Sequence, residues 1–192
     1  PQYEKTMKQL SPEITQLLNK KSTTDFLNAA RQFVTLLENG DLNQETFYKD
    51  SHKALSELYR TALNLETVEL IHSGPDSEFD EIDKDELRKM NKNLISNLGK
   101  DCFYWEVFDP TYTEENGKPG QGWKITDREP TQGWLVDDFA DIYADLKEEL
   151  TKIDQIRTDE SIEDALWQLK FGFNHHWGNH CIDAMRALHY LW

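Results

Sequence analysis

The sequence predicts an all-α fold, a single helical bundle with one irregular loop that is rich in glycine and proline. Apolar residues recur at intervals of three and four along most of the long segments, which is the period of one face of a helix. The period-two alternation of a half-buried strand is poor throughout. With 192 residues, the chain has the size of one ordinary domain and can bury a core without disulfide bonds.

Residues 1–22 are expected to form a loosely attached helical arm on a bundle domain of residues 23–192. Between Tyr3 and Lys20 the helical pattern is weak and is interrupted by Pro12. Proline is tolerated in the first turn of a helix, and Ser11 directly before it can cap that turn. A short helix starting at Pro12 is the expected result.

Two apolar stripes of helical period predict an antiparallel helical hairpin. The first helix covers 24–37, and because Asn39 and Gly40 follow it, we expect it to end in a left-handed cap. The second covers about 47–63, and Asp41 and Asn43 are available to cap its start. The residues expected to face inward are Phe26, Leu27, Ala30, Phe33, Val34 and Leu37 in the first helix, and Phe47, Ala54, Leu55, Leu58, Tyr59, Ala62 and Leu63 in the second.

Two polar segments interrupt the helical pattern. Residues 73–86 are acidic and turn-forming, so we interpret them as a solvated linker into a shorter helix at 87–98. Residues 109–133 form the loop rich in glycine and proline, whose arms could pair, although their poor alternation argues against a sheet. The first segment lacks the offsets of a calcium-binding EF-hand loop, and the second lacks the Lys-Ser or Lys-Thr of a phosphate-binding loop.

The composition argues against several classes of partner. The chain has 36 acidic and 21 basic residues and a formal charge of −15, whereas binding to nucleic acid relies on Lys and Arg. We therefore expect no nucleic acid partner and no membrane, and no segment approaches the roughly 20 apolar residues of a membrane helix. Cys102 and Cys181 fit no disulfide framework, so we expect reduced thiols in a cytoplasmic protein.

Acidic side chains accompany the apolar stripe of the predicted helix at 135–150. At about 100° per residue, Asp137 and Asp141 point away from the apolar side and are expected at the surface. Asp138 and Asp145 lie along one edge of the stripe, where their carboxylates can reach a neighbouring helix. These two aspartates are the acids of interest.

Histidines lie on the predicted inner face of the last segment, 162–192. His180 lies among apolar residues, His176 lies one turn before it, and Asp183 follows on the same edge. The other two histidines of this segment, His175 and His189, point outward. The sequence therefore predicts a cluster of two imidazoles and one carboxylate.

Two glycines, Gly172 and Gly178, flank these histidines within the predicted helix. Each costs about 1 kcal/mol in a helix interior relative to alanine. We therefore expect either a bend at this point or the close approach of another element.

Three interpretations of the His/Asp cluster are open. In the first, His176 and His180 are core imidazoles hydrogen-bonded to Asp138 or Asp145 across a helix interface, since buried polar groups are usually paired. In the second, the cluster binds zinc, iron or manganese, although neither HExxH nor a Glu-xx-His repeat is present. In the third, a His-Asp pair is a metal-free acid/base. The candidate metal ligands are Asp138, Asp145, His176, His180 and Asp183.

Aromatic residues gather near the irregular loop. Trp105, Trp123 and Trp134 are the candidates for lining a groove that binds a small molecule or a peptide. Packing of these rings against the core is the competing interpretation.

Three motifs in order resemble those of a known family. VFDP at 107–110, DDFADIYADLK at 137–147 and HWGNHCIDAMRALH at 176–189 are similar to motifs of an uncharacterised bacterial helical family, domain of unknown function 5063. Phe139 and Met185 each stand where the family pattern has leucine. The resemblance spans roughly residues 25–192 and implies a helical fold and a cytosolic bacterial protein, but no activity.

No motif specifies a reaction, so whether the chain is an enzyme is left open. The preferred hypothesis is a cytoplasmic protein-interaction or small-ligand-binding module without a cofactor, because neither a nucleophile nor a complete metal motif is evident. The partner would be an unidentified protein or small molecule, and a homo-oligomer is compatible with the sequence. The alternative is a metal-dependent hydrolase with a divalent transition metal between the two C-terminal helices.

Overall fold

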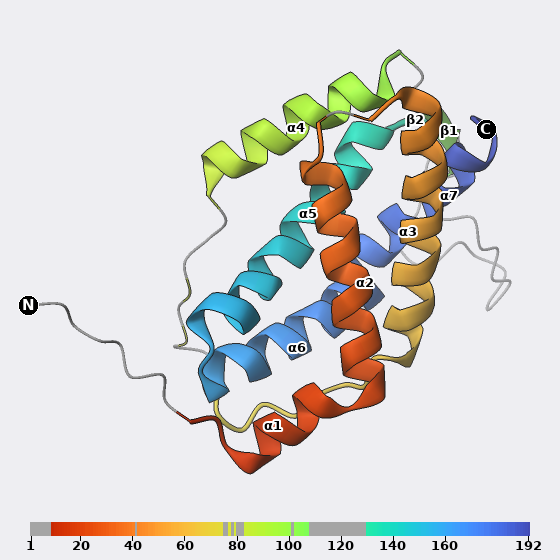
Figure 1. Cartoon of the computed structure of the whole chain (residues 1–192). Coiled ribbons are helices and arrows are strands. Elements are labelled where there is room, and N and C mark those ends of the chain that lie inside the picture. The colour runs from red at the N-terminus through yellow and green to blue at the C-terminus, as the bar shows by residue number, and fades with distance from the viewer. Residues whose placement is uncertain are drawn as a thin grey trace, which may run out of the picture.

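The structure, a computed structural model, describes residues 9–40, 42–74, 77, 79, 83–100, 102–107 and 130–192. Within these residues the chain forms seven α-helices, one short π-helix and a two-stranded sheet (Figure 1). The α-helices are α1 (Pro12–Asn19), α2 (Lys21–Glu38), α3 (Gln44–Asn64), α4 (Lys84–Leu98), α5 (Leu135–Thr151), α6 (Asp159–His175) and α7 (Trp177–His189). The π-helix is η2 (Lys152–Ile156), and the strands are β1 (Phe103–Glu106) and β2 (Thr131–Trp134). The predicted all-α bundle is confirmed.

Helix α1 begins at the predicted residues. The Ser11 hydroxyl accepts a hydrogen bond from the Ile14 amide at 3.2 Å, which satisfies one of the free N–H groups of the first turn. The Ser11 amide in turn donates to Asp159, in the first turn of α6, at 3.0 Å. Ile14 is buried in the core. The division into an arm and a bundle domain stays a prediction.

Helices α2 and α3 form the predicted hairpin and pack side by side (Figure 1). Asn43 caps α3 by accepting a hydrogen bond from the Thr46 amide at 3.0 Å. The left-handed cap expected for α2 is wrong, because Asn39 is extended with φ −81°. Helix α4 instead satisfies the last carbonyls of α2, since side-chain amides of that helix donate to them. These contacts are Asn93 to Glu38 at 3.0 Å and Asn97 to Asn39 at 3.1 Å.

Helix α5 lies at the centre of the bundle, in contact with α2, α4, α6 and α7. Phe139 of α5 packs against Phe33 of α2 and Phe47 of α3, each with a ring-centroid distance of 5.9 Å. The predicted apolar face is buried at Leu135, Phe139, Ile142, Tyr143, Leu146 and Leu150. Leu63 of α3, expected to face inward, is exposed instead. The central position of α5 brings its acidic edge next to α7.

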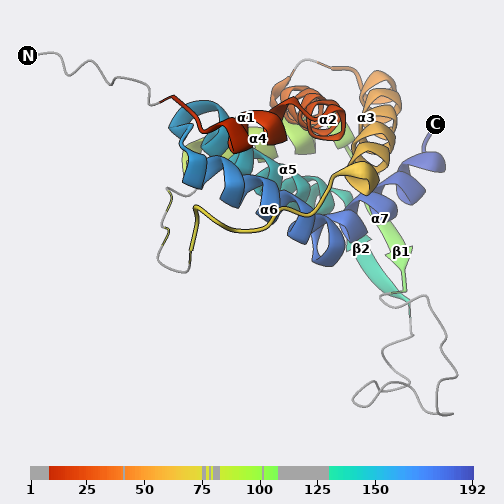
Figure 2. The ribbon, with the colours of Figure 1, turned by 90° about the horizontal axis from the view of Figure 1, so that it is seen from below.

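The segment predicted as one helix from 162 onward is divided into α6 and α7 at His176 (Figure 2). A Cβ atom at Gly172 would lie 2.8 Å from the Trp177 ring, and one at Gly178 would overlap the carbonyl oxygen of Phe173. The two glycines therefore permit both a bend and a close approach of the chain to itself. Trp177 is fully buried in the space that the bend creates.

The arms of the irregular loop pair as a sheet, so the expectation that no sheet forms is wrong. Strands β1 and β2 are antiparallel, with Tyr104 opposite Gly133, and they extend beyond the helices (Figure 2). The ladder continues to the start of α5, because the Leu135 amide donates to the Cys102 carbonyl at 2.8 Å. Each strand has four residues, which is too short for alternation to be recognised. Residues 108–129 of the loop lie outside the described residues.

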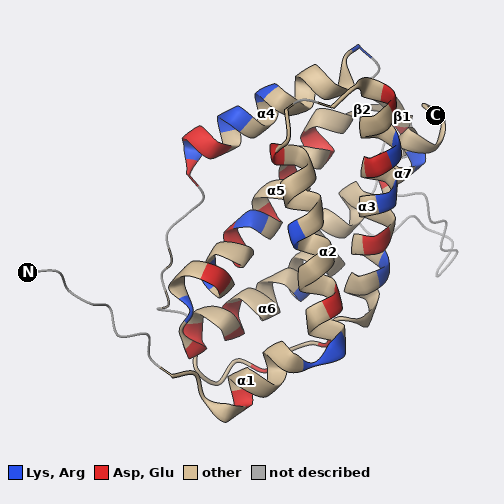
Figure 3. Ribbon diagram, viewed as in Figure 1, with Lys and Arg blue, Asp and Glu red and all other residues tan. Residues whose placement is uncertain are grey.

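Charged residues of both signs are interspersed along α3 and α4 (Figure 3). On α3, Lys49 pairs with Glu45 at 2.6 Å and Arg60 with Glu57. Such exposed pairs contribute little to stability individually, but they neutralise charge along the helix surface. Among the described residues, no helix combines the length and the apolar character that a bilayer-spanning segment requires.

Candidate metal centre

Two histidines contact carboxylates of α5: His180 lies in α7, and His176 lies between α6 and α7. Nδ1 of His180 lies 2.8 Å from Oδ1 of Asp138, and Nδ1 of His176 lies 2.7 Å from Oδ2 of Asp145. A carboxylate oxygen accepts hydrogen bonds, so the facing ring nitrogen carries the proton in each pair. The predicted hydrogen bonds across the interface are therefore confirmed, but His176 is exposed and His180 only partly buried, so neither is a core imidazole. Nε2 of such a ring has a free lone pair whenever the ring is neutral.

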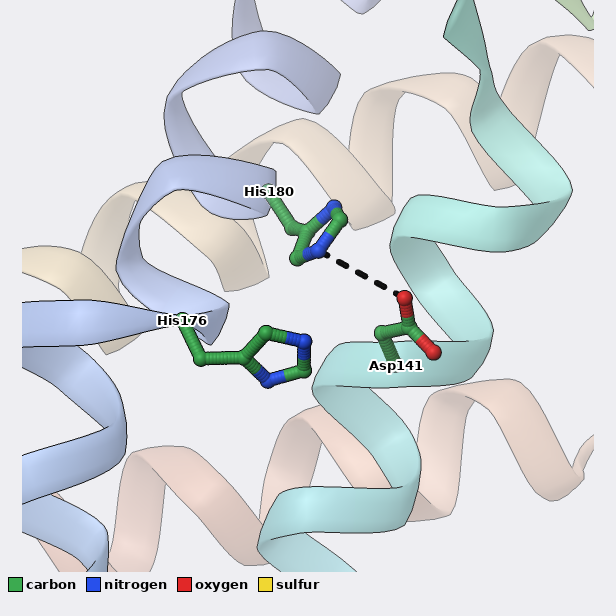
Figure 4. Close-up of side chains that lie close together, drawn as sticks. All are labelled: Asp141, His176 and His180. Atoms are coloured by element: carbon green, nitrogen blue, oxygen red, sulfur yellow. Dashed lines mark ion pairs between the residues drawn. The ribbon is translucent and has the colours of Figure 1, made fainter. Parts of the chain in front are cut away.

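The two Nε2 atoms point toward a third group, Asp141 of α5 (Figure 4). One ligand atom from each of His176, His180 and Asp141 lies within 4.8 Å of the other two, and Nε2 of His180 is 3.4 Å from Oδ2 of Asp141. The imidazole rings lie nearly perpendicular, at 81°, with centroids 5.1 Å apart. Two imidazoles and one carboxylate form a donor set that divalent transition metals accept.

The converging side chains differ from the predicted ligand set. Asp138 and Asp145 face the Nδ1 atoms and orient the rings, whereas Asp141, expected at the surface, is the carboxylate beside Nε2. Asp141 lies about 40° further round α5 than Asp145. The helical wheel places Asp141 outside the apolar stripe of α5, so it was assigned to the surface. The wheel does not show that an imidazole from a neighbouring helix extends past the edge of that stripe. Its spacing of three from Asp138 was the available signal.

Asp183, the remaining predicted ligand, is not among the residues whose ligand atoms converge, as far as the structure describes the chain. Its carboxyl group interacts with Glu106 of β1 and with Asp138 of α5. Burial foremost, and then the negative charges of Glu106 and Asp138, raise the pKa of Asp183 from 3.8 to about 6. Asp183 therefore belongs to a partly buried acidic group beside the three converging side chains.

Asp183 should make the protein less stable as the pH rises from about 4 to about 6. The unfolded chain releases this proton near pH 3.8 and the folded chain near pH 6, so the unfolded state binds fewer protons in that window and the free energy of unfolding falls. Above that window the loss is complete. The free energy of unfolding of Asp183→Asn, measured relative to that of the wild type, should therefore rise by about 1 kcal/mol from pH 4 to pH 7. This value is reduced for solvent screening.

Urea denaturation at both pH values, in the presence of a chelator, measures this difference. Asp137→Asn is the matched control, because it removes an aspartate from the exposed side of α5. Equal pH dependence of the two variants would contradict the assignment.

Protonation also affects the histidine site. The hydrogen bond to Asp138 raises the pKa of His180, and burial acts in the opposite direction. Burial raises the pKa of Asp141, whereas His180 acts to lower it. Protons therefore compete with a metal ion for Nε2 and for the carboxylate, so binding should weaken at low pH.

Tyr104 of β1 joins the same network, a contact that sequence reasoning missed. Its hydroxyl donates to Oδ2 of Asp138 at 2.7 Å. Burial foremost, and then the charge of Asp138, raise the pKa of Tyr104, so the hydroxyl stays protonated and acts as a donor. The only indication in the sequence was the position of Tyr104 in YWE, directly before the VFDP motif. That position marked an aromatic residue but did not predict its hydrogen bond to Asp138.

The tryptophans predicted to line a ligand groove lie on the hairpin, where the structure describes them. Trp105 is 66% exposed on β1, and Trp134, also exposed, stacks on Phe103 with a centroid distance of 6.0 Å. Trp123 lies outside the described residues. Binding of a ligand by these residues stays a prediction.

The fold and the site define an all-α helical bundle with a two-stranded hairpin, in which histidines and aspartates of two helices meet at one interface. Residues 17–192 match the Domain of unknown function (DUF5063) family, and the chain belongs to it, which confirms the resemblance seen in the three motifs.

A crystal structure shares this fold, that of protein BF1032 from Bacteroides fragilis. Its TM-score is 0.70 at 24% sequence identity, over 90% of this chain and 93% of that chain. At this identity the likeness concerns the fold alone. A comparison with curated proteins found no significant match.

Proposed function

We propose that the chain binds a divalent transition metal ion at Asp141, His176 and His180. One observation supports this above the others: both histidines donate Nδ1–H to a carboxylate while their Nε2 atoms converge with Asp141. Metal-ligating histidines almost always donate their second ring N–H to such a partner.

The spacing of the donors suits an ion of this class. Donors about 2.0–2.1 Å from a tetrahedral ion lie roughly 3.4 Å apart, the separation already present between His180 and Asp141. A small rotation of the half-exposed His176 ring would bring its Nε2 into the same range. The negative charges of Asp138, Asp141 and Asp145 favour a divalent cation at this point.

The proposed chemistry is hydrolysis. Three protein ligands leave a coordination position for water, and such an ion lowers the pKa of bound water toward neutrality. The side chains of His176 and Asp141 are 50% and 41% exposed, so solvent can reach this position. The proposal is therefore a metal-dependent hydrolase with its site between α5 and α7, of which metal binding is the first requirement.

Protein purified without a histidine tag should bind one equivalent of Co²⁺ or Zn²⁺, and Asp141→Asn should weaken this binding. The loss should exceed the roughly 10- to 100-fold typical of residues that only orient a ligand. Isothermal titration calorimetry measures the affinity, and the visible spectrum of the Co²⁺ form reports the ligand set. The metal-loaded protein should also hydrolyse a chromogenic ester faster than the Asp141→Asn variant.

His175→Ala is the matched control for this experiment. His175 is exposed, directly precedes His176, and faces a carbonyl of its own helix, Phe171, at 3.0 Å. Its loss should leave the affinity unchanged. A wild type without saturable binding, or an Asp141→Asn variant that binds as well as the wild type, would rule the site out.

A cytoplasmic interaction module is the second proposal, and one observation favours it. Phe103, Trp105 and Trp134 expose aromatic surface on the hairpin, and exposed apolar patches often mark interaction sites. The two cysteines are free and buried, in keeping with a reducing compartment. Sedimentation velocity over a range of concentrations tests whether a second copy of the chain covers this surface.

A further inference from the structure

We infer that Tyr104 is a positioning residue of the metal centre, and that the hairpin of β1 and β2 holds its hydroxyl against Asp138. This inference rests on the proposed function, because it assigns a role at the same site. It links an element outside the helical bundle to the orientation of a metal-ligating imidazole.

A continuous chain of polar contacts runs from the hairpin to the ligands. The Tyr104 hydroxyl donates to Oδ2 of Asp138 at 2.7 Å, and Oδ1 of the same carboxylate accepts from Nδ1 of His180 at 2.8 Å. On the far side of the His180 ring, Nε2 faces Asp141 at 3.4 Å. Each oxygen of Asp138 thus has its own donor. The orientation of the carboxylate, and with it that of the imidazole, depends on both donors.

Removing the first donor would free the carboxylate to rotate. The terminal torsion of aspartate has a broad energy profile, so two hydrogen bonds are needed to define the plane of the group. The side chain of Asp138 is only 7% exposed, which leaves little water to replace a lost partner. The alternative acceptor of the Tyr104 hydroxyl, Glu106, is 3.4 Å away and is a poorer partner.

Gly133 of β2 provides the space for this arrangement. It pairs with Tyr104 across the sheet, and a Cβ atom at this position would overlap the Tyr104 ring at its hydroxyl-bearing end. The ring therefore crosses the partner strand where no side chain is present, and this path brings the hydroxyl to α5. Any larger residue at 133 would displace the ring from Asp138.

The Tyr104→Phe variant tests the inference, because it removes the hydroxyl and retains the ring. We expect its affinity for Co²⁺ to fall about 3- to 10-fold, the loss of one hydrogen bond to a charged group acting through the partner of a ligand. In the metal-free protein, the ¹⁵N resonances of the His180 ring should shift toward a mixture of the two tautomers. A residue that only packs against the bundle would leave both quantities unchanged.

Tyr143→Phe is the matched control. The Tyr143 hydroxyl donates to the carboxylate of Glu38, at the end of α2, at 3.0 Å, and this contact includes neither histidine. Its loss should alter the melting temperature but neither the Co²⁺ affinity nor the His180 resonances. Gly133→Ala should reproduce the Tyr104→Phe result, and if that variant does not fold, Tyr104→Phe alone decides.

The possible failures are distinguishable. A wild type that does not bind Co²⁺ overturns the proposed function, and with it the role of Tyr104 at a metal centre. A wild type that binds Co²⁺, with the affinity and the His180 resonances preserved in Tyr104→Phe, overturns the inference about Tyr104 alone.

Discussion

Replacing Gly178 by alanine should destabilise the protein by about 2–3 kcal/mol, the cost of overpacking a filled interior. In an ordinary helix interior the same change stabilises by about 1 kcal/mol. Here the new Cβ would overlap the carbonyl oxygen of Phe173, and a backbone atom in α6 cannot move aside as a flexible side chain can. The melting temperature should fall by roughly 5–10 °C for a chain of this size.

The same substitution should also weaken metal binding, because Gly178 lies two residues from both His176 and His180. Thermal unfolding and Co²⁺ titration measure the two effects. Gly74→Ala is the control: no atom lies within 4 Å of a Cβ at Gly74, so its stability should remain within about 0.5 kcal/mol of the wild type. A Gly178→Ala protein as stable as the wild type would show that the bend at His176 does not require glycine.

Glu163→Ala should lower the free energy of unfolding by about 2–4 kcal/mol, because one buried carboxylate oxygen accepts three backbone hydrogen bonds. Oε2 of Glu163 accepts hydrogen bonds from the backbone amides of Ile71, His72 and Ser73 at 2.7, 2.6 and 2.9 Å. The residue is 2% exposed. Hydrogen bonds to a charged acceptor contribute about 1.5–3 kcal/mol each, and water reaching the exposed Ile71 and His72 would recover part of the loss.

Hydrogen exchange measures where this loss occurs. The amides of residues 71–73 should exchange much faster in Glu163→Ala, whereas the amides of α5 should change only through global stability. Glu163→Gln keeps one carbonyl oxygen as an acceptor and should lose about half as much. Glu69→Ala removes an exposed carboxylate from the same segment and should have little effect. Unchanged exchange at 71–73 in Glu163→Ala would contradict the proposed anchoring.

The helical pattern was sufficient to predict most of the bundle. The buried face of α5 matches the predicted stripe, and α1 and α3 begin at the predicted cap residues Ser11 and Asn43. The end of α2 was not predictable in the same way. Asn39 and Gly40 favour a left-handed cap locally, but two asparagines of α4 satisfy the same carbonyls from outside the helix. Side chains of α4, which are distant in sequence, therefore make hydrogen bonds to carbonyls at the end of α2 in place of a left-handed cap.

The sequence was sufficient to predict which two helix edges meet at the candidate site. Asp138 and His180 lie on facing edges of their helices, and a buried imidazole next to a carboxylate is expected to pair with it. The position of Asp141 beside His180 was missed, because the wheel places Asp141 beyond the apolar edge and its spacing of three from Asp138 was the only indication. The contribution of Tyr104 depends on the pairing of two four-residue strands, whose alternation is too short to predict.

The sequence by itself determined the helices, their buried faces and the meeting of aspartates with histidines at one interface, because these follow from the 3.6-residue period and from the need to pair buried polar groups. The tertiary structure alone decided which nitrogen faces which oxygen. The break at His176 and the reach of two imidazoles over the edge of α5 place Nε2 beside Asp141 and Nδ1 beside Asp138 and Asp145. A helical wheel contains angles about one axis, whereas a ligand set depends on the distance and tilt between two axes.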